Sequence, residues 1–281
     1  MHGLCERILQ FLRPLQVRGK GFLFQTVVPK QGVRYTRVWG KFHMDLDLSN
    51  AIHRQIFMGC FGRQMTVWTR DLLAPGDLFL DVGAHIGYFT LLAATRVHAQ
   101  GQVIAIEPNP AAFRSLQKHL QNNGIANVMA LPCALSSHEG TLRLFAPPST
   151  EQRDYNVTYL QRPGWDYLDV EAKTLDACCM EWKVKRVRLM KMDVEGAEPK
   201  VLQGGQIVLR EGRIQHLVCE VNGPRLTEGG YTPAQLIEQL DDLGFFPAIM
   251  KSGRAVPIAA SRLDLHPGHE HDRLFVHRTV Q

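Results

Sequence analysis

Carboxylates placed around glycines are the residues of this chain with the clearest chemistry. Asp81 precedes two glycines, Gly83 and Gly87, and Glu107 follows 20 residues after the second glycine. An aspartate before a glycine turn opposes a pyrophosphate but suits a ligand with an ammonium and a sulfonium, and glycines let the backbone approach that ligand. The third glycine of G-x-G-x-x-G is absent, which disfavours a dinucleotide. An acid placed like Glu107 can accept hydrogen bonds from both ribose hydroxyls.

A second acidic run supplies candidates for acid–base chemistry. It contains Asp193, Glu195 and Glu198, and the next strand brings Glu220. An alcohol that reacts as a nucleophile must lose a proton, which a nearby general base can accept. Asp193 is the first candidate because it ends a strand, and Glu195, Glu198, Glu220 and His85 are further candidates. A carboxylate or phenolate acceptor needs no base, and these side chains then only orient it.

The same carboxylates allow a metal reading and a structural reading. Asp193, Glu195 and Glu220 could converge as hard oxygen ligands for Mg²⁺. The structural alternatives are helix capping or pairing with Lys191 or Arg225. No dedicated metal site is assigned from the sequence.

Two further groups have both a functional and an ordinary interpretation. His269 and His271 stand two apart in a loop with Gly and Pro, a pattern more typical of a polar connection than of metal ligation. An irregular segment rich in aromatic residues either forms a lid over the acceptor or is a surface loop. Its candidate lid residues are Arg153, Tyr155, Tyr159, Trp165 and Tyr167.

Strands alternating with helices must position these residues. Such alternation predicts an α/β fold, with a mostly parallel sheet and helices on both faces, and ligands bind beyond the carboxyl ends of its strands. Helices are expected after the glycine loop and from Pro110, about Glu198 and Thr232-Pro233. Residues 135–186 interrupt the rhythm with an insertion in which 141–145 is an antiparallel strand. The expected strands of the main sheet are 78–82, 103–106, 128–131, 187–192, 217–221, 245–249 and 274–276.

The first 70 residues differ from the rest in pattern and in charge. They contain 11 Lys and Arg against 3 Asp and Glu, a net charge of +8, whereas residues 71–281 contain 21 against 24, a net charge of −3. We therefore expect a basic accessory region over 1–70 and a catalytic domain over 71–281. Helical spacing over 4–12, hairpins over 22–44, and a helix capped by Ser49 are predicted within the accessory region.

Composition bounds the class of protein. The chain has 281 residues, of which 45% are hydrophobic and 21% charged, which argues against a disordered, collagen-like or disulfide-scaffold chain. The six cysteines show no C-x-x-C pair, which fits a reducing cytosol. No apolar stretch reaches the roughly 18–20 residues of a membrane span. We expect a soluble cytoplasmic protein, and a peripheral membrane contact and a homo-oligomer stay open.

Together these motifs resemble the FkbM family of S-adenosylmethionine-dependent methyltransferases, from Asp45 to about Ile249. The resemblance implies a Rossmann-like class I sheet of seven strands whose last strand is antiparallel, and O-methylation of a small-molecule or glycan acceptor. The most specific motif is Asp193 to Glu198. The matching residues are Leu46-Asp47-Leu48-Ser49, Asp81 to Gly87, Glu107-Pro108-Asn109, Cys133-Ala134-Leu135-Ser136, Thr174-Leu175-Asp176, Asp193 to Glu198 and Glu220-Val221-Asn222.

The resemblance also implies a set of residues around S-adenosylmethionine. Cys133 and Ala134 would lie beside the adenine, with Leu135 or Ser136 closing the pocket, although core packing explains Cys133 equally well. The implied cofactor residues are Asp81, Gly83, Ala84, His85, Gly87, Glu107, Pro108, Cys133, Ala134, Ser136 and Asp193.

Three other functions compete with this interpretation. A nucleic-acid methyltransferase would use the basic N-terminal region to hold phosphates, but the catalytic part is acidic and has Asp-Val-Glu-Gly where base methylation commonly uses Asn/Asp-Pro-Pro-aromatic. A non-catalytic binding protein is disfavoured by the intact Asp81, Gly83, Gly87 and Glu107. An NAD-dependent oxidoreductase is disfavoured by the missing glycine.

Overall fold

The computed structural model describes residues 28–146, 157–263, 265–266, 268 and 270–280. Among these, residues 28–63 form one compact unit, and the described residues from 64 onward form a second. Each unit is treated by itself below. The predicted helical segment over 4–12 lies outside the described residues.

The N-terminal unit is a hairpin packed on a helix. Strands β1 (Val33–Val38) and β2 (Phe42–Asp47) pair antiparallel, and α3 (Ala51–Met58) follows. Successive side chains of the hairpin point to opposite faces, and those of Val38, Phe42 and their alternate neighbours are buried. The described part of the predicted hairpin region is thus confirmed.

The predicted cap of this helix was wrong by one residue. The side chain of Asn50 accepts a hydrogen bond from the His53 amide, which makes Asn50 the N-cap of α3. Ser49 is engaged elsewhere, because both its amide and its hydroxyl donate to Asp47 Oδ1, at 2.9 and 2.8 Å. Two adjacent cap formers were available, and the turn at Asp47 decided between them.

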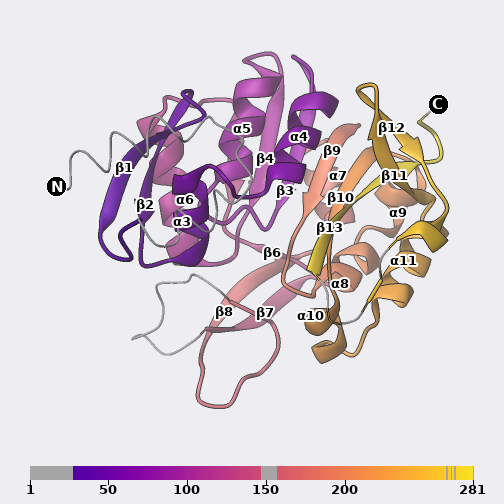
Figure 1. Ribbon diagram of the computed structural model, residues 1–281. Helices are drawn as coiled ribbons and strands as arrows, with labels where there is room; N and C mark the ends of the chain where they lie inside the picture. The colour runs from indigo at the N-terminus through magenta and orange to yellow at the C-terminus, as the bar shows by residue number, and fades with distance from the viewer. Residues whose placement is uncertain (1–27, 147–156, 264, 267, 269, 281) are drawn as a thin grey trace. The chain divides into compact units, whose positions relative to one another are not determined.

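The second unit is built on a sheet of eight strands in the order β12-β11-β13-β10-β9-β3-β4-β5 (Figure 1). Strands β5, β4, β3, β9 and β10 are parallel, and β13 runs antiparallel to β10, which confirms the expected Rossmann-like sheet with an antiparallel last strand. The eighth strand, β12, was not predicted, and it pairs with β11 at the edge. The bounds are β3 (Leu78–Val82), β4 (Gln102–Ile106), β5 (Val128–Leu131), β9 (Val187–Met192), β10 (Ile214–Asn222), β11 (Phe245–Lys251), β12 (Arg254–Pro257) and β13 (Glu270–His277).

Local signals in the sequence set the helix starts. The Asn109 side chain accepts from the amides of Ala111 and Ala112, and Thr232 forms a capping box with Gln235. Both caps precede a proline at the first helical position, as predicted. The helices from residue 63 onward are α4 (Arg63–Leu72), α5 (Tyr88–Val97), α6 (Pro110–Asn122), α7 (Leu175–Glu181), α8 (Glu198–Gln203), α9 (Gln206–Arg210), α10 (Gly223–Glu228), α11 (Pro233–Asp242) and a 3₁₀ turn over Ala260–Arg262.

The core lies where the central strands meet the helices. All nine residues of β10 are buried, as expected of a parallel strand that is covered on both faces. A large apolar cluster joins β9 and β10 to α7, α8, α9 and α11. The buried charged side chains of β9 and β10, Lys191 and Glu220, need counter-charges or hydrogen bonds.

The predicted insertion forms a small separate sheet. Strands β6 (Ala134–Leu135), β8 (Asp166–Lys173) and β7 (Gly140–Ala146) lie in the order β6-β8-β7, apart from the main sheet in Figure 1. β7 confirms the antiparallel strand expected over 141–145. Leu144, Val170 and Ala134 form its small core.

Two observations bear on the class of protein. Within the described ranges, no helix combines the length and the apolar character that crossing a membrane requires. The five cysteines of those ranges, Cys60, Cys133, Cys178, Cys179 and Cys219, are free thiols.

Candidate active site

Backbone hydrogen bonds bring the carboxyl ends of three strands together. The amides of Gly83 and Ala84 both donate to the Ile106 carbonyl at 3.0 Å, which joins the end of β3 to that of β4. The Asp193 amide donates to the Val82 carbonyl at 3.1 Å, which joins β9 to β3. Asp81, Glu107 and Asp193, predicted separately from three motifs, therefore stand at one edge of the sheet.

The glycine loop allows close contact on both sides. Gly83 has φ +79°, and a Cβ there would lie 1.9 Å from the carbonyl oxygen of Asp193. Gly87 has φ +88°, and its Cβ would lie 2.5 Å from Leu116 Cδ1 on α6. The first glycine thus lets the loops after β3 and β9 touch, and the second lets α5 begin against α6.

A buried lysine links the first two acidic motifs. Lys191 lies directly opposite Asp81 in the parallel pairing of β9 with β3. Its Nζ donates to the Gly83 carbonyl at 2.9 Å and lies 3.2 Å from Asp193 Oδ2 and 3.6 Å from Asp81 Oδ1. Thr90 completes the group by donating to Asp81 Oδ2 at 2.6 Å.

The charges of this group depend on one another. Burial acts to lower the pKa of Lys191, but the charges of Asp193 and Asp81 outweigh it, so its pKa lies above the ordinary value. Burial raises the pKa of Asp81, and the Lys191 charge and the Thr90 hydrogen bond act against that rise. Lys191 is therefore the cation that makes a buried carboxylate tolerable at this edge.

Glu107 is oriented by backbone amides. Its Oε2 accepts from the His85 amide at 2.7 Å and its Oε1 from the Asn109 amide at 2.8 Å. Burial raises the pKa of Glu107 to about 7, although both hydrogen bonds oppose the shift. Each carboxylate oxygen has a second lone pair, so the group can still accept from a ligand.

The loop between β9 and α8 is held from inside by Glu198. This fully buried carboxylate accepts from the amides of Val194, at 3.0 Å, and Gly196, at 3.4 Å, both in the loop before α8. It therefore holds that loop and does not cap the helix, whose N-cap residue Ala197 makes no side-chain cap hydrogen bond. Burial raises the pKa of Glu198 to about 7. Glu195, at φ +56°, pairs with Arg225 at 3.2 Å, the other predicted alternative.

The predicted lid residues fall into separate groups. Tyr159 donates to the Gly196 carbonyl at 3.0 Å, and Lys200 Nζ lies 3.9 Å from the centre of its ring. Burial raises the pKa of the Tyr159 hydroxyl to about 12, so it stays a donor. Trp165 stands near Arg162, whereas Tyr167 contacts Arg143 on the small sheet. Arg153 and Tyr155 lie outside the described residues.

The remaining predicted residues occupy other surroundings. Cys133 is buried in the main core, as its packing interpretation predicted, and Ala134 in that of the small sheet. The Ser136 amide donates to the Lys173 carbonyl, and the Ser136 carbonyl lies against Gly204 at the end of α8. Glu220 is buried on β10 opposite Asp272 of β13. The adenine-side role of Cys133, Ala134 and Ser136 stays a prediction, and so does the acid–base role of Glu220.

The Mg²⁺ interpretation finds no support in the arrangement of side chains. In the part of the chain that the structure describes, no three His, Cys, Asp or Glu side chains group closely enough to hold a metal. Asp193 and Glu195 pair with Lys191 and Arg225 instead of converging with Glu220. His269 lies outside that part.

The residues at this edge fit a cationic cofactor with a ribose. Three carboxylates, those of Asp81, Glu107 and Asp193, gather at this edge, and Lys191 supplies one compensating positive charge. Asp81 Oδ1 is buried and accepts no hydrogen bond from the described residues. S-adenosylmethionine carries an ammonium and a sulfonium that suit such acids, and two hydroxyls that suit Glu107.

Comparison with known proteins agrees with this geometry. Residues 81–247, more than half of the chain, match the family described as the methyltransferase FkbM domain. The chain belongs to this family. The matched FkbM domain contains the three strand ends, the glycine loop and the Asp193 to Glu198 run.

Three curated relatives show how far the likeness extends. Methyltransferase 1 from Beauveria bassiana is 32% identical over 46% of this chain, and the chain spans 59% of that relative's length. The 31-O-demethyl-FK506 methyltransferase FkbM from Streptomyces tacrolimicus is 27% identical over 64% of this chain and 77% of its own. The hexuronic acid methyltransferase AglP from Haloferax volcanii is 24% identical over 63% of this chain and 67% of its own.

Lys191 is the residue of the FkbM domain whose importance the motifs understated. It was considered only as one partner for a carboxylate, whereas it contacts two of them and the glycine loop. The available signal was a lysine inside a strand of Val, Leu and Met, since a buried ammonium group needs a counter-charge.

The contact at Gly83 predicts a large effect of one methyl group. Gly83→Ala brings a Cβ against the Asp193 carbonyl, so the strand ends must separate, and we expect about 1–3 kcal/mol of loss beyond the strain of the left-handed backbone. Gly253→Ala is the matched control, because Gly253 has φ +75° and nothing lies within 4 Å of its Cβ position. Urea unfolding measures both, and equal losses would contradict the packing argument.

Removing the Lys191 charge should destabilise the FkbM domain in a pH-dependent way. Lys191→Met leaves Asp81 and Asp193 without their cation, which should cost about 3–5 kcal/mol of unfolding free energy at neutral pH. The loss should be smaller at pH 5 than at pH 8, since Asp81, with its raised pKa, can then bind a proton in the folded state.

Urea unfolding at the two pH values measures this loss. Lys251→Met, at an exposed strand end, makes the same chemical change and should shift stability by less than about 0.5 kcal/mol. Equal changes in the free energy of unfolding for the two variants would show that the buried ion pairs of Lys191 do not stabilise the domain.

Proposed function

We propose that this chain transfers the methyl group of S-adenosylmethionine to an oxygen atom of a small-molecule or sugar acceptor. The observation that carries the proposal is the joining of Asp81, Gly83, Glu107 and Asp193 at one sheet edge by backbone hydrogen bonds within an FkbM domain. S-adenosylmethionine supplies an electrophilic methyl group on a positively charged sulfur.

The cofactor side of the proposed site uses groups that are already oriented. Glu107, fixed by the His85 and Asn109 amides, would hold the ribose hydroxyls. Asp81 and the glycine loop would face the methionine end. Because these groups are held by hydrogen bonds, little ordering is required on binding, which favours affinity.

The acceptor side is assigned to Asp193. Its Oδ2 faces Lys191 at 3.2 Å, and about a third of the side chain is exposed. We assign the other oxygen, Oδ1, to the acceptor hydroxyl, where it would orient the oxygen and take its proton as the oxygen–methyl bond forms and the sulfur–methyl bond breaks, with the electron pair of the broken bond left on the sulfur. Glu195 and Arg225, paired beside it, would contact polar groups of the acceptor.

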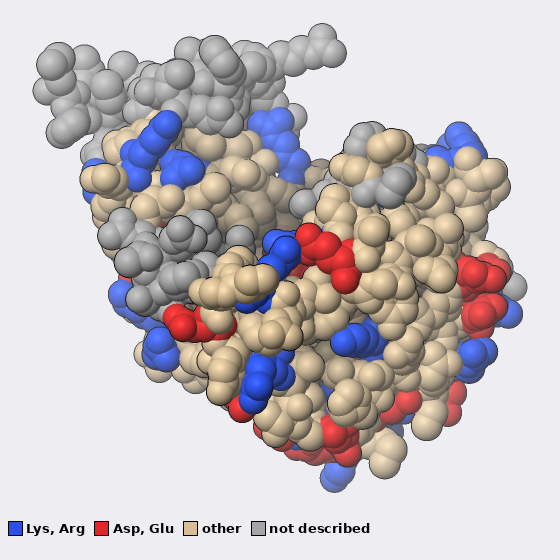
Figure 2. All heavy atoms as spheres, turned by 90° about the horizontal axis from the view of Figure 1, so that it is seen from below, with Lys and Arg blue, Asp and Glu red and all other residues tan. Residues whose placement is uncertain are grey.

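The relatives and the surface favour a small acceptor over a nucleic acid. One relative is named for O-demethyl-FK506 and another for hexuronic acid, so both a metabolite and a sugar are reasonable acceptor classes to test. On the face drawn in Figure 2, Lys and Arg side chains lie in separate patches with Asp and Glu among them. A nucleic-acid backbone is usually held by a continuous basic surface.

Cofactor binding tests the first half of the proposal. Calorimetry should show S-adenosylmethionine binding and no NAD binding, and Glu107→Ala should abolish the former because the ribose loses its acceptor. Glu139→Ala, which removes an exposed acid near the start of the insertion, is the control and should bind normally. If NAD bound and S-adenosylmethionine did not, the oxidoreductase alternative would replace the proposal.

Turnover tests the second half. With a panel of sugars, uronic acids and hydroxylated metabolites and a labelled methyl donor, Asp193→Asn should keep cofactor binding but lose transfer by at least about 100-fold, a typical effect of removing a general base. Normal turnover by this variant would remove Asp193 from the reaction. Binding without transfer to any compound by the unchanged protein would favour the non-catalytic alternative.

A further inference from the structure

The outer face of the N-terminal hairpin carries alternating basic and apolar side chains. Alternate residues of β1 point away from the core, and the turn continues the series. Val33 is 61% exposed, Tyr35 59% and Trp39 49%, and Arg37 and Lys41 are also exposed. We call these five residues the hairpin stripe.

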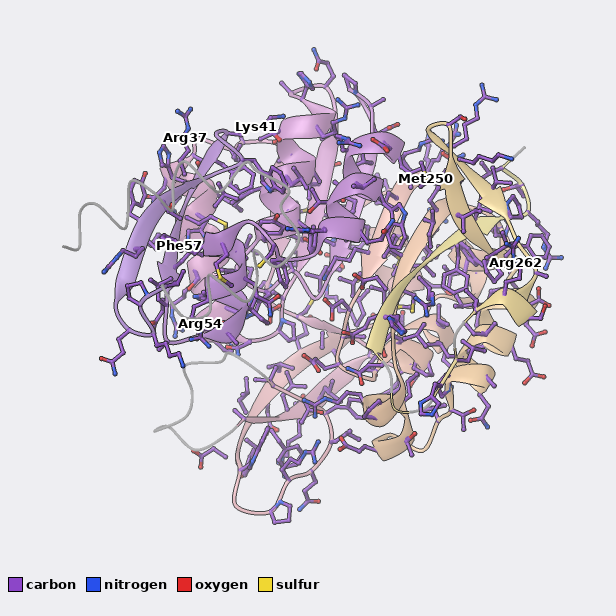
Figure 3. The ribbon with its side chains drawn as sticks, in the orientation of Figure 1. Arg37, Lys41, Arg54, Phe57, Met250 and Arg262 are labelled. Atoms are coloured by element: carbon purple, nitrogen blue, oxygen red, sulfur yellow. The ribbon has the colours of Figure 1, made fainter. Side chains whose placement is uncertain are left out.

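The turn presents the largest apolar group of the hairpin stripe. Trp39 has φ +53°, a left-handed conformation that favours glycine and is unusual for a bulky residue. Lys41 closes the turn by donating from its amide to the Val38 carbonyl. Figure 3 shows Arg37 and Lys41 near this end of the hairpin. An indole ring is thus kept out of the core at the hairpin tip, with a cation on either side.

This combination matches the chemistry of a lipid surface. Indole and phenol rings settle at the level of lipid headgroups, where one part is apolar and another polar. Arg and Lys beside them attract anionic headgroups. We infer that the hairpin tip binds anionic membrane surfaces, with Trp39 entering the headgroup region and Arg37 and Lys41 contacting lipid phosphates.

Charge distribution along the hairpin favours a membrane over a nucleic acid. Asp45 lies opposite Tyr35 and Asp47 opposite Val33, so the outer face turns acidic away from the tip. A nucleic acid lying along the hairpin would bring its phosphates next to these carboxylates, which would repel them. A membrane that meets only the turn would not, because Asp45 and Asp47 lie opposite Tyr35 and Val33, which are roughly 13 and 20 Å along the strand from Trp39.

Vesicle flotation with the full-length chain tests the inference. The protein should float with phosphatidylcholine vesicles that contain phosphatidylserine and stay behind with phosphatidylcholine alone. Arg37→Glu/Lys41→Glu should lose at least about tenfold in vesicle affinity. Lys251→Glu/Arg254→Glu is the matched control, because these exposed cations flank the β11–β12 turn and change the net charge equally.

A second variant tests the apolar part of the hairpin stripe. Trp39→Ser keeps the charges and should also lose vesicle binding, while circular dichroism and S-adenosylmethionine binding report that each variant is folded. Equal loss in the matched control, unchanged binding of either hairpin variant, or no binding by the unchanged protein would overturn the inference. Binding to a single-stranded RNA oligonucleotide in place of vesicles would also overturn it and assign the stripe to nucleic acid.

Discussion

A single buried ammonium group connects the parts of the candidate site. Lys191 stands opposite Asp81 in the sheet, faces Asp193 two residues later and donates to the carbonyl of Gly83. Without this cation, two carboxylates near the sheet interior would repel each other and would be poorly solvated. The acidic character that suits a cationic cofactor therefore depends on a positive charge beneath it.

Further constraints follow from how closely the loops meet. The contact between Gly83 and the Asp193 carbonyl sets how closely the glycine loop, proposed to face the cofactor, approaches Asp193, proposed to face the acceptor. Glu198 then holds the loop that follows Asp193 from within, and Tyr159 holds it from outside through Gly196. The residues proposed for methyl transfer thus stand in loops that these contacts hold in place.

Sequence reasoning succeeded where the cause is local. Apolar runs gave the seven expected strands, and Asn-Pro and Thr-Pro gave two helix starts, because cap and backbone chemistry act within a few residues. It chose Ser49 instead of Asn50 as the N-cap of α3, because a hydrogen bond between Ser49 and Asp47 could not be foreseen. It also missed β12, a short strand that forms only by pairing with β11. The role of Lys191 depends on the register of β3 against β9, which no single strand encodes.

The contact of Tyr159 with Gly196 has a consequence for how new acceptors could be accommodated. The segment that carries Tyr159 belongs to the insertion, whereas Gly196 belongs to the rigid loop beside Asp193. Under the proposed function, substitutions at Tyr159 would therefore change the loop beside the acceptor while keeping the contacts of Lys191 with Asp81 and the glycine loop. Variants that take other acceptors could then be sought in the insertion, with the acidic motif left unchanged.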